Sequence, residues 1–204
     1  MIVIVDYGMG NLGSVSKSLK KAHSQIKISN KHNDIEMSDK IILPGVGNFK
    51  KAMKNLESLN LIELLNHKVL EMKTPILGIC LGMQLFSEFS EEGNVRGLSW
   101  INSSVVKFKV SDKIRFKVPH MGWNSVKIKK NSPLLMDLAG DNLFYFVHSY
   151  HLVCDNEKDI LATTNYSYEF VSAVQKDNIF GTQFHPEKSH LDGQMIINNF
   201  VNQI

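Results

Sequence analysis

The sequence has few cysteines and no long apolar run, and each of these shortages excludes a class of protein. Only two of its 204 residues, Cys80 and Cys154, are cysteines, and they lie far apart. This excludes a disulfide scaffold and a cysteine-rich zinc site, and it fits a reducing, cytoplasmic environment. The longest apolar runs, such as Met1 to Val5, are far shorter than the roughly 20 residues that a bilayer-spanning helix needs.

Charge of one sign is also scarce, because the net charge is only +3. So small and scattered an excess does not indicate a nucleic-acid-binding protein. No basic stretch precedes the first apolar run and Asp6 interrupts it, so we expect a first strand and not a signal peptide. With 43% apolar and 21% charged residues, the chain has the composition of a globular protein that builds its own core.

The first half of the sequence alternates short apolar runs with helical patterns. Runs of β-forming residues predict strands at 2–5, 26–28, 40–43 and 76–79. Apolar spacings of three and four predict helices at 11–22, 49–56, 61–69 and 82–89. Strands that alternate with helices indicate βαβ units around a mostly parallel sheet.

The second half is richer in strand patterns and ends in an amphipathic helix at 191–201. Strands are predicted at 105–110, 114–118, 126–128, 143–147, 150–153, 171–175 and 179–183. Lys176-Asp177-Asn178 is a good hairpin tip. We therefore expect an α/β fold, 1–204 as a single domain, with a three-layer open sheet flanked by helices and an antiparallel extension or small side sheet in the C-terminal half.

The most specific local pattern is Gly78-Ile79-Cys80-Leu81-Gly82, which lies between a predicted strand and a predicted helix. Because glycine has no Cβ, the two glycines let strand and helix pass close to each other at a sharp turn. Such a turn pushes Cys80 onto its tip, as in a nucleophile elbow, and the start of the following helix favours the thiolate. The alternative is a small buried hydrophobe at the turn.

A cysteine nucleophile needs a base, and Phe184-His185-Pro186-Glu187 supplies the best candidate. Residues two apart on an extended chain point to the same side, and Pro186 keeps His185 extended. Glu187 can therefore orient the imidazole, which predicts a triad of Cys80, His185 and Glu187. The alternative is a solvent-exposed turn.

Acyl chemistry also needs hydrogen-bond donors for a developing oxyanion. The amide of Leu81, directly after the nucleophile, is one natural donor. The segment Pro44-Gly45-Val46-Gly47, at the end of another predicted strand, can supply a second through its backbone. The alternative for this segment is an ordinary turn at a strand end.

Two other patterns suggest a cofactor or a metal. The segment from Gly8 to Gly13 fits G-x-G-x-x-G, the dinucleotide fingerprint of an oxidoreductase, but no acid follows the second strand until Asp34. That interpretation also leaves Cys80 and His185 without a role. His148 and His151 face opposite sides of a predicted strand, with no third ligand at suitable spacing. We predict neither a metal nor a cofactor.

Taken together, these residues resemble the class I, triad-type glutamine amidotransferases. The resemblance rests on the segment from Gly78 to Gln84 and on His185-Pro186-Glu187. Three further segments are similar to the glutaminase subunits of histidine biosynthesis: Asp6 to Asn11, Leu43 to Gly47 and Pro119 to Asn124. The resemblance covers essentially the whole chain.

The resemblance implies a mechanism in which Cys80 attacks the side-chain amide of glutamine. The backbone of Leu81 and of Val46 and Gly47 would hold the oxyanion, and His185, oriented by Glu187, would protonate the departing ammonia. Matching positions that hold glutamine in such enzymes are Gln84, Glu92, His148, Ser149 and Tyr150.

The resemblance also implies a heterodimer with a (β/α)₈-barrel cyclase, which receives the ammonia through an internal channel. Positions that match the docking face are Asn11, Trp123, Asn124 and Lys188. Two departures, Gly13 in place of a common Arg and the segment Leu98 to Ile101, are closer to paralogues that feed ammonia to surface-sugar amidination. That pathway is the alternative for the acceptor.

Overall fold

The computed structural model describes residues 1–22, 25–112, 114–138 and 142–204. Its large sheet has the strand order β2-β1-β3-β4-β14-β13-β11-β7-β5-β6. The first five strands in this order run parallel. They are β2 (Ile26–Ser29), β1 (Ile2–Val5), β3 (Lys40–Gly45), β4 (Ile76–Cys80) and β14 (Ile179–Thr182).

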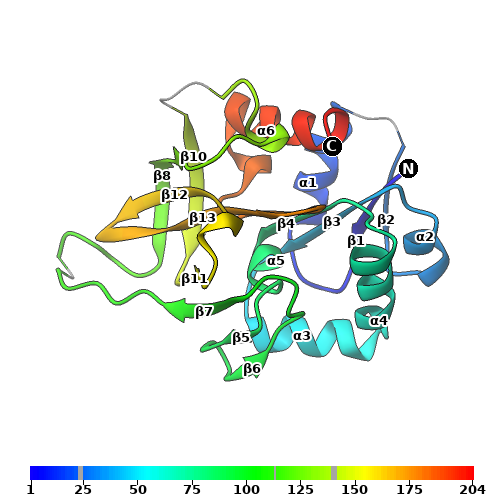
Figure 1. The fold of residues 1–204 in the computed structure, drawn as a ribbon, viewed down its shortest axis with the longest axis horizontal. Coiled ribbons are helices and arrows are strands. Elements are labelled where there is room, and N and C mark those ends of the chain that lie inside the picture. Colours follow the sequence, from blue (N-terminus) through cyan, green and yellow to red (C-terminus); the bar gives the residue numbers. More distant parts are fainter. Residues whose placement is uncertain (23–24, 113, 139–141) are drawn as a thin grey trace.

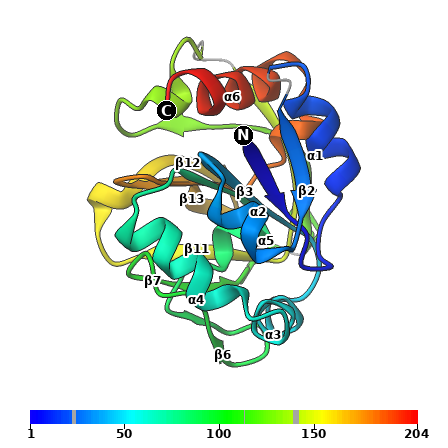
Figure 2. The same cartoon turned by 90° about the vertical axis from the view of Figure 1, so that its right-hand side faces the viewer.

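Helices cover both faces of the parallel strands (Figures 1 and 2). Successive side chains of a strand point to opposite faces, so β1 divides its residues between two cores. Val3 and Val5 pack in the core under α3 (Phe49–Ser58) and α4 (Leu61–Asn66). The alternate residues Ile2 and Ile4 pack in the core under α1 (Leu12–Leu19) and α6 (His190–Asn202). The expected three-layer architecture is confirmed.

Beyond β14 the sheet continues in mostly antiparallel strands, and the C-terminal half adds a second, small sheet. The extension comprises β13 (Tyr168–Lys176), β11 (Tyr150–Cys154), β7 (Ser103–Lys107), β5 (Phe89–Ser90), β6 (Val95–Arg96), β12 (Ile160–Tyr166) and β9 (Lys127–Ile128). The second sheet pairs β8 (His120–Ser125) with β10 (Leu143–His148). Both the extension and the side sheet are therefore present, and Asp177-Asn178 turns the predicted hairpin between β13 and β14.

Short helical elements connect the strands. They are α2 (His32–Glu36), α5 (Leu81–Gln84), the π-helix η1 (His67–Glu71) and the 3₁₀ helices η2 (Pro133–Leu135), η3 (Glu157–Asp159) and η4 (Pro186–Lys188). The helix predicted at 82–89 is wrong beyond Gln84. The carbonyls of Leu85 and Phe86 accept hydrogen bonds from the segment at 98–101, which replaces the helical ladder.

The strand predicted at 114–118 is also wrong, because that segment forms turns and bends. Four strands were not predicted: the two-residue strands β5 and β6, and the longer β8 and β12. The sequence of β8 includes Gly122 with φ +135, and few of its residues are strong β-formers. Pairing with β10 in a six-residue register makes it a strand.

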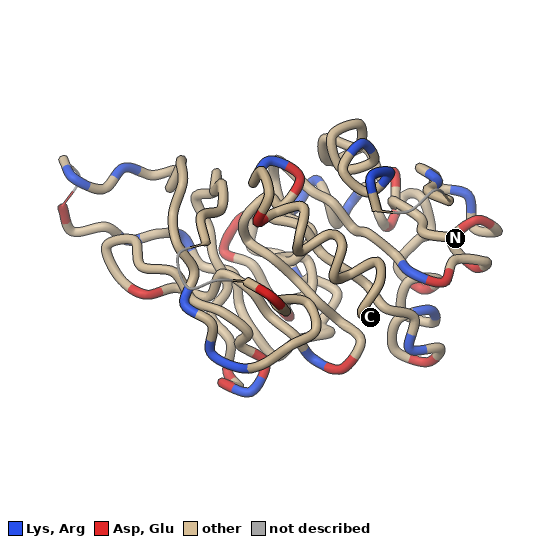
Figure 3. The backbone as a smooth tube through the Cα atoms, turned by 90° about the horizontal axis from the view of Figure 1, so that it is seen from above, with Lys and Arg blue, Asp and Glu red and all other residues tan. Residues whose placement is uncertain are grey.

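Basic and acidic residues are interspersed along the backbone (Figure 3). Among the described residues, no helix is both long and apolar enough to cross a membrane.

The parallel strands all end at one edge of the sheet, where the predicted site residues are concentrated. Cys80 ends β4, and Val46 follows β3 directly. His185 and Glu187 follow β14, which pairs with β4 in a register that joins Gly181 to Gly78. The fold therefore brings together residues that are about a hundred positions apart in the sequence.

Candidate active site

Cys80 lies at the tip of a sharp turn between β4 and α5. Its φ of +55° and ψ of −109° are unusual for a residue other than glycine, and such strain clusters at functional sites. A Cβ on Gly82 would lie 1.8 Å from the carbonyl oxygen of Leu43, and one on Gly78 would lie 2.5 Å from the ring of Phe86. Only glycine fits at both positions, so the predicted strand–turn–helix arrangement is present.

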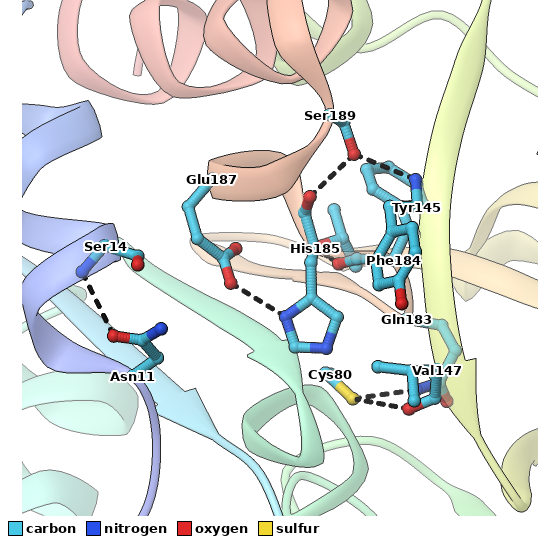
Figure 4. Close-up of polar contacts among 11 residues, drawn as sticks. Asn11, Ser14, Cys80, Tyr145, Val147, Gln183, Phe184, His185, Glu187 and Ser189 are labelled. Atoms are coloured by element: carbon cyan, nitrogen blue, oxygen red, sulfur yellow. Dashed lines mark hydrogen bonds and ion pairs between the residues drawn. The ribbon is translucent and has the colours of Figure 1, made fainter. Parts of the chain in front are cut away.

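His185 and Glu187 form a buried pair beside this turn. The Nδ1 atom of His185 lies 2.8 Å from Oε1 of Glu187, and both side chains are 2% exposed. The amide of His185 donates to the carbonyl of Tyr145, and the hydroxyl of Ser189 donates to the carbonyl of His185. These contacts attach the loop after β14 to β10 and direct the imidazole toward Cys80 (Figure 4).

The Nε2 atom of His185 is buried and has no hydrogen-bond partner within the described part of the chain. Burial lowers the pKa of this imidazole, but the negative charge of Cys80 and the hydrogen bond with Glu187 outweigh burial and raise that pKa to about 10. The His185 ring is therefore favoured as an imidazolium, and it faces the sulfur of Cys80. An uncommitted Nε2 proton beside the sulfur of Cys80 is an arrangement that suits a general acid.

The sulfur of Cys80 also receives a hydrogen bond from Gln183, a residue that the sequence analysis missed. Gln183 Nε2 lies 3.5 Å from Sγ, and Gln183 Oε1 accepts from Gln84 Nε2 at 2.9 Å. The thiol lies 4.0 Å from the carbonyl of Val147. Gln183 is completely buried, and a buried amide at a strand end carries no sequence pattern that distinguishes it from an ordinary strand residue.

A cavity of about 310 Å³ opens in front of Cys80. Its lining contains every residue predicted as nucleophile, oxyanion donor or substrate contact, namely Val46, Gly47, Cys80, Leu81, Gln84, Glu92, His148, Ser149 and Tyr150. Pro119 and Val147 complete the lining. His185 and Glu187 are not among the lining residues. A larger hollow of about 670 Å³ lies over β12 and β13, but its lining holds no cysteine or histidine.

The predicted oxyanion segment lies directly beside the nucleophile, because Gly45 and Cys80 are paired across β3 and β4. The hydroxyl of the buried Tyr7 donates to the carbonyl of Pro44 at 2.7 Å and fixes the start of the segment. Gly47 has φ +107, which only glycine adopts readily. Val46 is 39% exposed. The segment is thus anchored at one end and open toward the cavity at the other.

Two of the predicted substrate contacts also support the walls of the cavity. Gln84 Nε2 donates to the carbonyl of Tyr150 at 3.0 Å. One carboxylate oxygen of Glu92 accepts from the amide of Phe49 at 2.7 Å, at the start of α3. Burial and then the charges of Glu92 and Glu91 raise the pKa of Tyr150. Glu92 therefore links the cavity to the helix that follows the oxyanion segment.

The four residues predicted to meet a partner differ in their surroundings. Trp123 is 46% exposed and stacks on His190 at a centroid distance of 4.8 Å. Lys188 lies over the ring of Tyr145. Asn11 caps α1 through Ser14. Asn124 instead turns its amide inward.

The glycine-rich loop does not favour a dinucleotide site. A Cβ on Gly10 would lie 3.4 Å from Pro44, so this glycine serves the contact between the loop and the oxyanion segment. The third glycine of a dinucleotide fingerprint allows close helix–strand packing, yet a Cβ on Gly13 would meet only Asn11, at 3.9 Å. Among the described residues, no group of three or more His, Cys, Asp or Glu side chains is placed to hold a metal ion.

The sequence matches one protein family over nearly its whole length. Residues 3–204 match the family described as Glutamine amidotransferase class-I. A relative from Methanococcus maripaludis, named imidazole glycerol phosphate synthase subunit HisH 2, is 52% identical over the full length of both chains. A relative from Campylobacter jejuni, named imidazole glycerol phosphate synthase subunit HisH 1, is 48% identical over 98% of this chain and 99% of its own.

The fold is also similar to solved structures. A crystal structure of a Thermoplasma acidophilum protein superposes with a TM-score of 0.72 at 22% sequence identity. The match covers 98% of this chain and 91% of that one.

Proposed function

The chain belongs to the class I glutamine amidotransferase family, and we propose that residues 1–204 form one catalytic domain that hydrolyses glutamine to glutamate and ammonia. The observation that carries this proposal is the convergence of Cys80, His185 and Glu187 at one sheet edge, beside a cavity of about 310 Å³. Nothing in this chemistry requires a metal or a cofactor.

In the first half-reaction, the Cys80 thiolate attacks the side-chain carbonyl carbon of glutamine. A C–S bond forms, and the carbonyl oxygen becomes an oxyanion that the amides of Leu81 and of the Val46-Gly47 segment stabilise. The tetrahedral intermediate collapses with cleavage of the C–N bond. His185 Nε2 donates its proton to the departing nitrogen, which leaves as ammonia, and a γ-glutamyl thioester remains on Cys80.

In the second half-reaction, the now neutral His185 takes a proton from water, and the hydroxide attacks the thioester carbon. Collapse of this second intermediate breaks the C–S bond and releases glutamate with a regenerated thiolate. Glu187 holds the imidazole in one orientation through both halves, and its charge favours the imidazolium whenever it forms.

We further propose that the ammonia passes to a (β/α)₈-barrel cyclase in a cytoplasmic heterodimer, which makes imidazole glycerol phosphate and AICAR in histidine biosynthesis. The names of the two relatives support this acceptor. Ammonia released into water near neutral pH is mostly protonated and no longer nucleophilic, so a sealed interface is needed. Asn11, Trp123, Asn124 and Lys188 are the proposed contacts.

A second acceptor remains the alternative, namely a cyclase-like partner that serves surface-sugar amidination. Gly13, where many histidine-pathway members have Arg, favours it, and the exposed position of Gly13 on α1 places this difference near the proposed docking residue Asn11. Purified complexes with either type of partner, assayed for transfer of ammonia, distinguish the two acceptors.

The proposed chemistry is tested by replacing each cysteine in turn. With the partner subunit present, Cys80→Ala should abolish glutaminase activity, because the nucleophile is lost. Cys154→Ala should retain nearly normal activity, because Cys154 lies on β11 outside the lining of the cavity. Equal losses in the two variants would contradict the proposal.

A further inference from the structure

A cluster of buried aromatic rings and histidines adjoins the cavity, with His148 in the cavity lining, and the proposed chemistry does not use most of it. The ring of His120 is sandwiched between Tyr166, at a centroid distance of 4.1 Å, and Phe146, at 4.9 Å. His120 is 3% exposed and His148 is 6% exposed. Polar rings at this depth need hydrogen-bond partners, and those partners form a continuous chain.

The partners fix the position of each ring proton. The carbonyl of Tyr150 only accepts, so His148 must donate to it from Nδ1, at 2.7 Å. The Nε2 atom of His148 is then an acceptor, and His120 donates to it from Nδ1 at 3.0 Å. The Nε2 atom of His120 in turn accepts from the amide of Asn124 at 3.3 Å. Both rings are therefore neutral Nδ1–H tautomers.

The charges of the rings agree with this assignment. Burial lowers the pKa of His120 to about 4, and burial lowers the pKa of His148 well below its ordinary value. Near neutral pH both rings are uncharged. A second proton on His120 would point an N–H group at the amide hydrogens of Asn124 and break the chain at its outer end.

The inner end of the chain reaches the nucleophile. The carbonyl of Tyr150 accepts from His148 and also from Gln84. Gln84 donates its other amide hydrogen to Gln183, which donates to the sulfur of Cys80. The orientation of Gln84 thus depends on the direction of the Tyr150 carbonyl. The hydrogen bond from His148 Nδ1 fixes that direction.

We propose that His120 and His148 are positioning residues for the glutamine site, connecting Asn124 on β8 to the Tyr150 carbonyl and through it to Gln84 and Cys80. The inference rests on the proposed function and deepens it. In this arrangement, hydrogen bonds connect β8 directly to the cavity wall. β8 also carries Trp123, which is exposed and is expected to meet the partner. A displacement of β8 on docking is then transmitted to the groups around the sulfur.

The test compares His120→Phe with His120→Asn. Phenylalanine keeps the ring sandwich but removes both hydrogen bonds, whereas asparagine keeps a donor close to the position of Nδ1. In the complex with the cyclase-type partner, we expect His120→Phe to lower glutaminase kcat by about tenfold with less than about a threefold change in KM. His120→Asn should recover kcat to within about threefold of the wild type.

His151→Phe is the matched control. His151 lies in the same cluster, 4.6 Å from Phe108 between ring centroids, but its ring bonds to Leu152 and Tyr168 and not to the cavity wall. It should leave kcat within about twofold of the wild type. Equal kcat values for His120→Phe and His151→Phe, or an Asn variant as impaired as the Phe variant, would overturn the inference.

A second measurement needs no variant and no activity. Long-range proton–nitrogen NMR spectra of the wild-type chain near neutral pH should show His120 and His148 as Nδ1–H tautomers. An Nε2–H tautomer at either residue would overturn the inference even if the enzyme is fully active. A wild-type complex that is inert toward glutamine while both tautomers are as expected would instead overturn the proposed function, and the positioning role with it.

Discussion

At the scale of single residues, the site depends on how the Glu187 carboxylate changes the orientation and the pKa of the His185 imidazole. Glu187 lies beside His185, with 2.8 Å between Oε1 and Nδ1, although the 3₁₀ helix η4 begins at Pro186 and the chain there is not extended as predicted. This hydrogen bond is one of the causes that raise the pKa of His185 against the effect of burial. The carboxylate therefore acts in two ways, through orientation and through charge.

Glu187→Gln separates these two effects, because the amide oxygen can still accept from Nδ1 but carries no charge. We expect kcat to fall about a hundredfold, because the carboxylate charge no longer stabilises the imidazolium in the transition state for ammonia release. The raised pKa of about 10 keeps His185 protonated below that pH. Without the charge, the alkaline limb of kcat/KM should move to lower pH by at least about one unit.

The pH dependence of kcat/KM in the complex checks this prediction, with His185→Gln as an inactive reference. An alkaline limb that stays at the wild-type pH in Glu187→Gln would show that Glu187 does not set the pKa of the base.

A site residue can be predicted from the sequence when it belongs to a recognisable local pattern. Cys80 lies between two glycines that a sharp turn requires, and His185 and Glu187 are separated by one proline, so both groups can be found in the sequence. Gln183 and His120 act through contacts made across the sheet and between β8 and β10. No spacing in the sequence records those contacts.

At the scale of elements, the turn between β4 and α5 depends on the absence of two Cβ atoms. Gly82→Ala places a methyl group 1.8 Å from the carbonyl oxygen of Leu43, a backbone atom that cannot rotate away. We expect a loss of at least about 3 kcal/mol in the free energy of unfolding, because β3 and α5 must separate.

Gly13→Ala is the matched comparison, since a methyl group there meets only Asn11 at 3.9 Å in the first turn of α1. This change should be neutral or stabilise the free chain by about 0.5 kcal/mol, because alanine restricts the unfolded chain. Urea unfolding of the two variants measures the contrast, and equal stabilities would contradict it.

The elements that sequence patterns predicted are those whose apolar spacing matches their burial. The parallel strands and α1, α3 and α6 fall in this class. β8 escaped prediction because neighbours, and not its own composition, make it a strand. α5 ends early because the carbonyls of Leu85 and Phe86, directly after it, accept hydrogen bonds from the segment at 98–101. This contact joins segments that are separated in the sequence.

At the scale of the whole molecule, the buried histidines make stability depend on pH. Burial lowers the pKa of His120 to about 4 and lowers those of His148 and His151. The unfolded chain takes up these protons near pH 6.5, so the contribution is fully present above that pH and is lost as pH falls toward 4. For His120 alone the loss between about pH 7 and about pH 5 is roughly 2 kcal/mol.

Unfolding free energies from urea titrations at these two pH values check the prediction. The wild type should lose more stability on acidification than His120→Phe does, by roughly 2 kcal/mol. Parallel losses in the two proteins would contradict a neutral, buried His120.

The pairing of β4 with β14 has a consequence for how this architecture tolerates variation in length. Adjacent strands lie about 4.8 Å apart, and that spacing sets the distance between the strand ends that precede His185 and carry Cys80. Insertions in the outer loops between positions 81 and 178 can therefore lengthen the polypeptide without separating the two reacting groups. For the proposed glutaminase, that stretch can therefore differ between lineages to suit different recipients of nitrogen while the proposed hydrolytic centre stays unchanged.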